Sequence, residues 1–108
     1  MLKALSIKNY ALIEQTRITF DSGLSVITGE TGAGKSIMLG ALGLVLGQRS
    51  DVSVIRDKER KCVIEAAFHV SRYGLQPLFE EEDVDYDDET VLRREILPSG
   101  KSRAFVND

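Results

Sequence analysis

Residues 29–36 read Gly-Glu-Thr-Gly-Ala-Gly-Lys-Ser, and this stretch decides how the rest of the chain is interpreted. It matches the pattern G-x-x-x-x-G-K-[ST] at every fixed position. Glycines let successive backbone N–H groups point inward as a nest for phosphate oxygens, and a following helix adds the positive end of its dipole. The β-branched residues 26–28 precede the loop and the uncharged run 37–46 follows it. This order predicts a strand, a phosphate-binding loop and a helix.

The loop residues have separate expected roles. Lys35 would bring a mobile positive charge to the β- and γ-phosphates of a nucleotide, and the Ser36 hydroxyl would ligate a bridging Mg²⁺. Lys35 is the only residue of the chain for which we expect a catalytic role. The expected nucleotide-binding residues are Gly29, Glu30, Thr31, Gly32, Ala33, Gly34, Lys35 and Ser36, with Ser36 as the metal ligand.

Length and composition narrow the class of protein. With 108 residues the chain has room for one domain, residues 1–108. The net charge is −3, but residues 80–89 hold eight of the 17 acidic residues, so the rest has 14 basic against 9 acidic side chains. Net charge therefore does not argue against a polyanionic partner. No apolar run is long enough for a membrane span, so we expect a cytoplasmic protein without membrane contact.

Hydrophobic periodicity predicts the elements around the loop. Residues 2–20 alternate as two half-buried strands, and residues 61–70 form the clearest strand of the chain. The single cysteine, Cys62, lies in this strand and is expected in the core; one Cys and one His exclude a disulfide and a Cys/His metal cluster. His69 is expected to point outward from the same strand.

The helix after the loop should start near Lys35 and, because its body has no charge, be buried on several sides. Gly47 is the expected C-cap. Gly40 and Gly43 suggest that another backbone packs closely there. Further along, we expect a short helix at 75–82, a solvated acidic stretch, and a hairpin of 90–97 with 102–106 turning at residues 98–101.

Phosphate binding alone does not make an enzyme. A phosphate-loop ATPase also needs an acidic residue at the end of a second strand and a group that orients water. No apolar run ending in Asp follows the loop here. The chain therefore lacks part of a catalytic apparatus. A small kinase or GTPase would need its own base-reading motif, such as Asn-Lys-x-Asp, which is absent. A scaffold lobe that keeps the loop for anion binding remains an alternative.

Other stretches carry a resemblance to a known family. The alternating start that ends in Asn9-Tyr10, the turn at Gly23-Leu24 and the loop resemble the N-terminal lobe of SMC-like and RecF-like ATPase heads. Many relatives have Arg after the Asn-aromatic pair, where this chain has Ala11. The resemblance implies an α/β fold of the P-loop NTPase class: the N-terminal lobe of an ABC/SMC-type head, with a mostly antiparallel sheet and a buried P-loop helix.

The same resemblance implies a function. It implies ATP and Mg binding, and ATP hydrolysis by the whole protein, in double-strand break repair and recombination. The implied partners are DNA, the missing C-terminal half of the same head, and a second copy joined through head and coiled coil. It also implies a protein several times longer, associated with the nucleoid.

Five further basic residues have two interpretations each. Arg49 follows the helix, where related heads often hold an arginine near nucleotide or DNA; a solvated arginine is the simpler reading. A set on the expected hairpin could meet DNA phosphates or serve solubility alone. This hairpin set is Arg93, Arg94, Lys101 and Arg103.

Overall fold

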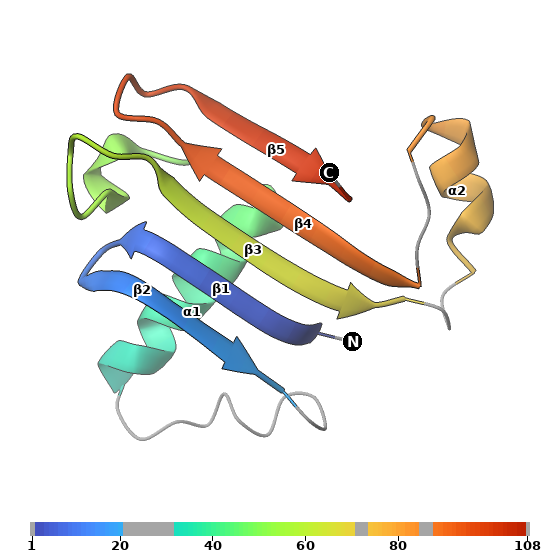
Figure 1. Ribbon diagram of the computed structural model, residues 1–108, viewed down its shortest axis with the longest axis horizontal. Helices are drawn as coiled ribbons and strands as arrows, with labels where there is room; N and C mark the ends of the chain where they lie inside the picture. The colour runs from blue at the N-terminus through green and yellow to red at the C-terminus, as the bar shows by residue number, and fades with distance from the viewer. Residues whose placement is uncertain (1, 21–31, 71–73, 85–87, 108) are drawn as a thin grey trace.

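The computed structural model describes residues 2–20, 32–70, 74–84 and 88–107. In these ranges the chain forms an antiparallel sheet of five strands in the order β2-β1-β3-β4-β5 (Figure 1). This confirms the expected α/β class with an antiparallel sheet. The strand expected at 24–28 lies outside the described residues. The elements are β1 Leu2–Tyr10, β2 Ile13–Thr19, α1 Gly32–Val45, a 3-10 helix Val52–Val54, β3 Cys62–His69, α2 Gln76–Glu81, β4 Glu89–Ile96 and β5 Ser102–Val106.

The core lies on one face of this sheet. Ile7 of β1 is paired with Ile64 of β3, and both side chains are fully buried. Cys62 and Ala66 flank Ile64 on the same face and are equally buried, as the alternation of this strand predicts. His69, at the end of β3, is exposed, which confirms its expected outward position.

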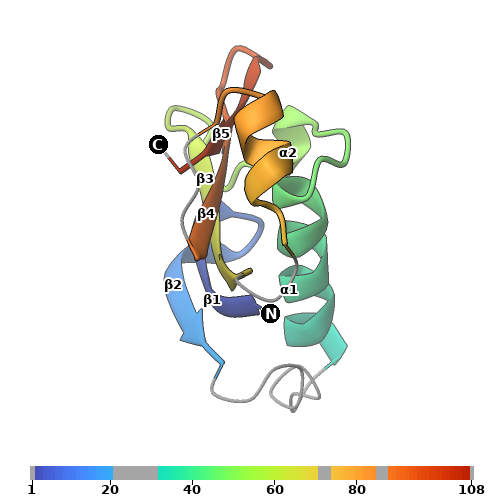
Figure 2. The same ribbon diagram turned by 90° about the vertical axis from the view of Figure 1, so that its right-hand side faces the viewer.

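Helix α1 packs across β1, β3 and β4 on the core face, and no described helix covers the opposite face (Figure 2). Its residues Ala41, Leu44 and Val45 are buried against the sheet. Leu39 and Leu46 are 48% and 59% exposed. The expectation of burial on several sides therefore holds only for the face toward the sheet. The helix also starts at Gly32, three residues before the expected start.

The glycines of α1 mark close contacts with side chains, not with another backbone, which corrects the expectation. A Cβ on Gly40 would lie 2.6 Å from the hydroxyl oxygen of Tyr10, and one on Gly43 would meet the Gln48 amide. Gly47 has a φ of 111°, and its N–H donates to the Leu44 carbonyl at 3.1 Å. This left-handed residue confirms the expected C-cap.

The C-terminal half follows the expected order. β4 and β5 form a hairpin in which Ile96 is paired with Ser102, and Gly100 takes a φ of 95° in the turn. α2 lies in the connection from β3 to β4, beyond one end of the sheet (Figure 1). The acidic residues 80–83 at the end of this helix are exposed. None of the helices in the described ranges is long and apolar enough to cross a membrane.

Candidate nucleotide-binding helix and basic groove

The described part of the phosphate-loop motif is the first turn of α1. Gly32 opens the helix, and the Lys35 and Ser36 side chains are exposed. The first N–H groups of an α-helix have no partner within the helix, so they are available to an anion. The first turn contains no acidic residue that would oppose an anion. Three predicted site residues, Gly29, Glu30 and Thr31, lie outside the described residues.

The other end of α1 is fixed by Arg94. This arginine lies on the core face of β4, where it is paired with Ile64. Its Nη1 donates to the carbonyls of Leu44 at 2.8 Å and Gln48 at 3.0 Å. Its Nε donates to the Ser102 hydroxyl of β5 at 2.6 Å. A charged donor on carbonyls at a helix C-terminus is favoured by the helix dipole, so Arg94 ties α1 to the β4–β5 hairpin.

The expected basic cluster on the hairpin does not form. Adjacent residues of a strand point to opposite faces, so Arg93 and Arg94 are separated by the sheet. The Arg93 guanidinium lies 4.1 Å from the centre of the Phe105 ring and its Nε 3.4 Å from Glu95. Lys101 and Arg103 are exposed. Arg94 is occupied by helix α1, so the four residues offer no single surface to DNA.

Asn9 shapes the loop that leads into β3. Its side chain is buried, with 6% exposure, and its backbone φ is 58°, a value that asparagine tolerates better than most residues. Its Oδ1 accepts from the Asp57 N–H at 2.7 Å. Its Nδ2 donates to the carbonyls of Asp57, Arg60 and Lys61 at 3.0, 3.1 and 3.3 Å. Asn9 thus has a structural role that sequence reasoning missed, because it holds the loop that leads into β3.

Tyr10 turns to the core from the next position. It is buried, forms an isolated bridge with Ile55, and has its hydroxyl near Gly40 of α1. Burial raises its pKa, with a further contribution from nearby Cys62. Cys62 itself lies in the core, as expected, and burial raises the pKa of its thiol to about 11. The thiol is therefore protonated at neutral pH and unsuited to nucleophilic chemistry.

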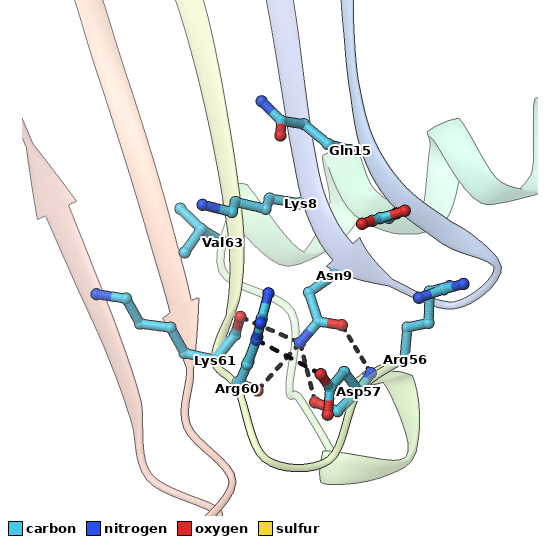
Figure 3. A pocket seen from close by; sticks show the side chains of 9 residues that line it. Lys8, Asn9, Gln15, Arg56, Asp57, Arg60, Lys61 and Val63 are labelled. Atoms are coloured by element: carbon cyan, nitrogen blue, oxygen red, sulfur yellow. Dashed lines mark hydrogen bonds and ion pairs between the residues drawn. The ribbon is translucent and has the colours of Figure 1, made fainter.

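A groove of about 550 Å³ opens where the β1–β2 hairpin meets the loop held by Asn9 (Figure 3). We call it the basic groove. It is lined by the basic residues Lys8, Arg56, Arg60 and Lys61 and by the carboxylates of Glu14 and Asp57. The sequence had not suggested it, because the lining comes from segments that lie about 50 residues apart. Arg49 lies outside it as an exposed residue, consistent with the solvated reading.

Solved structures with this arrangement define a class. A structure described under ATP-driven dimerization and DNA-stimulated activation of SMC ATPases superposes with a TM-score of 0.73, at 24% identity, over 98% of this chain and 69% of that chain. A structure of the recombination mediator protein RecF, described as RecF-ATPrS, gives a TM-score of 0.70 at 19% identity, over 99% of this chain and 26% of that one. The fold is that of an SMC-like and RecF-like ATPase head. This confirms the expected fold class.

Sequence comparison gives the family. The family described as AAA domain matches residues 4–102, and the chain belongs to it. The chain is 43% identical to the DNA repair protein RecN of Vibrio cholerae over 108 residues, and 44% identical to RecN of Bacillus subtilis over 109 residues. These matches cover 99% of this chain and 20% and 19% of the two relatives, so the chain spans about one fifth of their length. Within the SMC-like group, the stretches 9–13, 41–49 and 100–107 and the phosphate loop 29–36 resemble RecN, and the relatives confirm this resemblance.

Proposed function

We propose that residues 1–108 form the N-terminal lobe of the ATP-binding head of an SMC-like DNA repair ATPase, which acts in double-strand break repair and recombination. The observation that carries this proposal is the phosphate-loop motif running into α1, with Lys35 and Ser36 exposed on its first turn. The AAA domain match and the name of the relatives, DNA repair protein RecN, support it. A kinase, a GTPase or a scaffold lobe has no comparable support.

Different residues of the motif would bind different parts of MgATP. Backbone N–H groups of residues 29–34 would contact the phosphates, Lys35 would neutralise part of their charge, and the Ser36 hydroxyl would ligate Mg²⁺. The residues present fit the group, because the first turn of a helix has N–H groups without a partner inside the helix, and Lys35 and Ser36 add two exposed polar side chains. The metal would supply further charge neutralisation at the phosphates. Within this chain Lys35 is the only residue to which we assign a catalytic role.

Exposed leucines on and just after α1 are the basis for the first proposed partner. Leu39 of α1 and Leu46, which follows the helix, are exposed, and α1 has no charged residue after Lys35, so this side of the helix suits a further apolar surface. The second half of the same head is the proposed cover, since the relatives are about five times longer than the match. DNA and a second copy of the protein, joined through head and coiled coil, are the other proposed partners. The protein would act in the cytoplasm, at the nucleoid.

Calorimetric titration with MgATP, MgADP and MgGTP tests the nucleotide site. We expect adenine nucleotides to bind and Lys35→Ala to weaken binding by about tenfold or more, since a charge-assisted contact contributes about 1.5–3 kcal/mol. Lys58→Ala removes the same charge from an exposed lysine outside the motif and should leave binding unchanged. Equal binding by Lys35→Ala and the unmodified protein would show that the site is assigned wrongly.

A further inference from the structure

The basic groove carries charge that the fold itself does not use. It has four basic and two acidic side chains, an excess of two positive charges in a chain whose net charge is −3. Within the described residues, Lys8 and Arg56 form no ion pair, and both are exposed. In Figure 3 their side chains extend from different segments on two sides of Asn9. Two unpaired cations that share one groove suit an anion with more than one charged group.

The other two cations, Arg60 and Lys61, each have a carboxylate partner. Arg60 is 76% exposed and its Nε lies 3.5 Å from Asp57, in a pair three residues apart. Exposed pairs of this kind contribute about 0–1 kcal/mol, so a phosphate can replace the carboxylate at little cost. Lys61 is half exposed and contacts the buried Glu95 at 3.2 Å. All four cations are therefore accessible to a ligand.

The loop that carries three of them is fixed before any ligand arrives. Asn9 forms four hydrogen bonds with the backbone of residues 57–61, and the Asn9 carbonyl accepts from the Arg56 N–H at 3.3 Å. The loop is thereby tied to the end of β1 (Figure 3). A rim that is already ordered loses less conformational entropy on binding. A buried asparagine thus holds an exposed basic rim in place.

The chemistry of the lining selects the kind of anion. The remaining lining residues are Asn9, Gln15 and Val63, so the described lining of the groove contains no aromatic side chain on which an unpaired base could stack. Binding of single strands relies on such stacking, whereas binding of duplex DNA without sequence preference relies on phosphate contacts alone. The sheet residues Lys8, Gln15 and Val63 are register partners on the face that α1 leaves open. A long polyanion can therefore approach without meeting α1.

We propose that the basic groove binds the phosphate backbone of duplex DNA, with Lys8 and Arg56 as the principal contacts and Arg60 and Lys61 as exchangeable ones. This inference rests on the proposed function in naming DNA as the polyanion, and it adds the surface that holds it. The hairpin residues Lys101 and Arg103 do not line the groove, although Arg103 lies on the same open face of the sheet.

The test compares two double variants of the full-length protein that change charge equally. Lys8→Gln with Arg56→Gln empties the groove of its unpaired cations. Arg49→Gln with Lys101→Gln is the matched control, because both residues are exposed, one after α1 and one in the β4–β5 turn, and neither lines the groove. Fluorescence anisotropy with a labelled duplex, repeated from about 50 to 200 mM salt, gives the affinity and its salt dependence. We expect the groove variant to bind about tenfold more weakly and its log–log salt slope to fall by about two, with the control near the unmodified protein.

Three results would overturn the proposal: equal losses in both variants, a loss in the control alone, or tighter binding of single-stranded than of duplex DNA. Absence of duplex binding by the unmodified protein would also overturn it. MgATP titration of the same samples separates this inference from the proposed function. Groove variants that lose DNA but keep MgATP support both, whereas loss of MgATP binding in every sample would contradict only the nucleotide assignment.

Discussion

The guanidinium of Arg94 donates a hydrogen bond of 2.8 Å to the carbonyl of Leu44, joining the middle of β4 to the last turn of α1. The same side chain reaches the Gln48 carbonyl and the hydroxyls of Ser50 and Ser102. One planar group thus joins the helix, the loop after it and the hairpin. Lysine cannot make the same hydrogen bonds in these different directions, because its charge is a single point on a flexible chain.

Replacing Arg94 should therefore destabilise the fold. We expect Arg94→Lys and Arg94→Met each to lower the free energy of unfolding by about 2–3 kcal/mol, because two helix carbonyls lose a charged donor. Arg103→Met removes an exposed arginine from the same hairpin and should change it by less than about 0.5 kcal/mol. Urea titration followed by circular dichroism measures both. Similar values for the two arginines would contradict the anchoring role.

Asn9 allows strain and hydrogen bonding to be separated. Asn9→Ala loses four side-chain hydrogen bonds and puts alanine, which tolerates the left-handed region less well than asparagine, at a φ of 58°. Asn9→Gly loses the bonds without that strain. We expect about 3 kcal/mol of destabilisation for alanine and about 1 kcal/mol less for glycine. Asn9→Asp keeps the acceptor for the Asp57 N–H but turns an oxygen toward three carbonyls, so it too should destabilise. Full stability of the aspartate variant in urea would refute this account of the loop.

These two residues show where sequence reasoning succeeds and where it stops. The alternation in β3 predicted its buried face correctly, because every residue of a strand obeys the same period of two. Asn9 contacts residues 48 to 52 positions away, and Arg94 contacts residues 44 to 50 positions away, so no local pattern could assign their roles. The mistaken cluster on the hairpin was avoidable, since period two alone places Arg93 and Arg94 on opposite faces. The nucleotide site follows from the motif and stays a prediction.

The raised pKa of the Cys62 thiol predicts how the stability of the fold changes at alkaline pH. Its thiol has an ordinary pKa of 9.0, and burial raises this to about 11 in the folded chain. Between these values the unfolded state loses a proton that the folded state keeps, so stability should fall as pH rises from about 9 to 11. The free energy of unfolding should fall less steeply with pH in Cys62→Ala. The cavity left by the removed thiol changes the stability at every pH but not this slope. Denaturant titrations across this pH range measure the slope, and equal slopes in both proteins would count against a shielded thiol.

Gly40 and Tyr10 offer a double-mutant test of the packing between α1 and β1. A methyl group at residue 40 would lie 2.6 Å from the Tyr10 hydroxyl oxygen and 3.8 Å from the ring carbon that bears it. Gly40→Ala should therefore destabilise the protein by about 1–3 kcal/mol, as overpacking does. In a Tyr10→Phe background the clashing oxygen is gone, and the helix propensity of alanine should make the same substitution neutral or stabilising by up to about 1 kcal/mol.

Gly43→Ala is the matched control for this cycle, because the nearest atoms to its new methyl group would be those of the flexible Gln48 side chain. That side chain is exposed and can move aside, so we expect Gly43→Ala to be neutral or stabilising in both backgrounds. Thermal unfolding of the four Gly40 and Tyr10 combinations gives the coupling free energy. A coupling near zero would mean that the tyrosine hydroxyl does not set the distance between the phosphate-loop helix and the sheet.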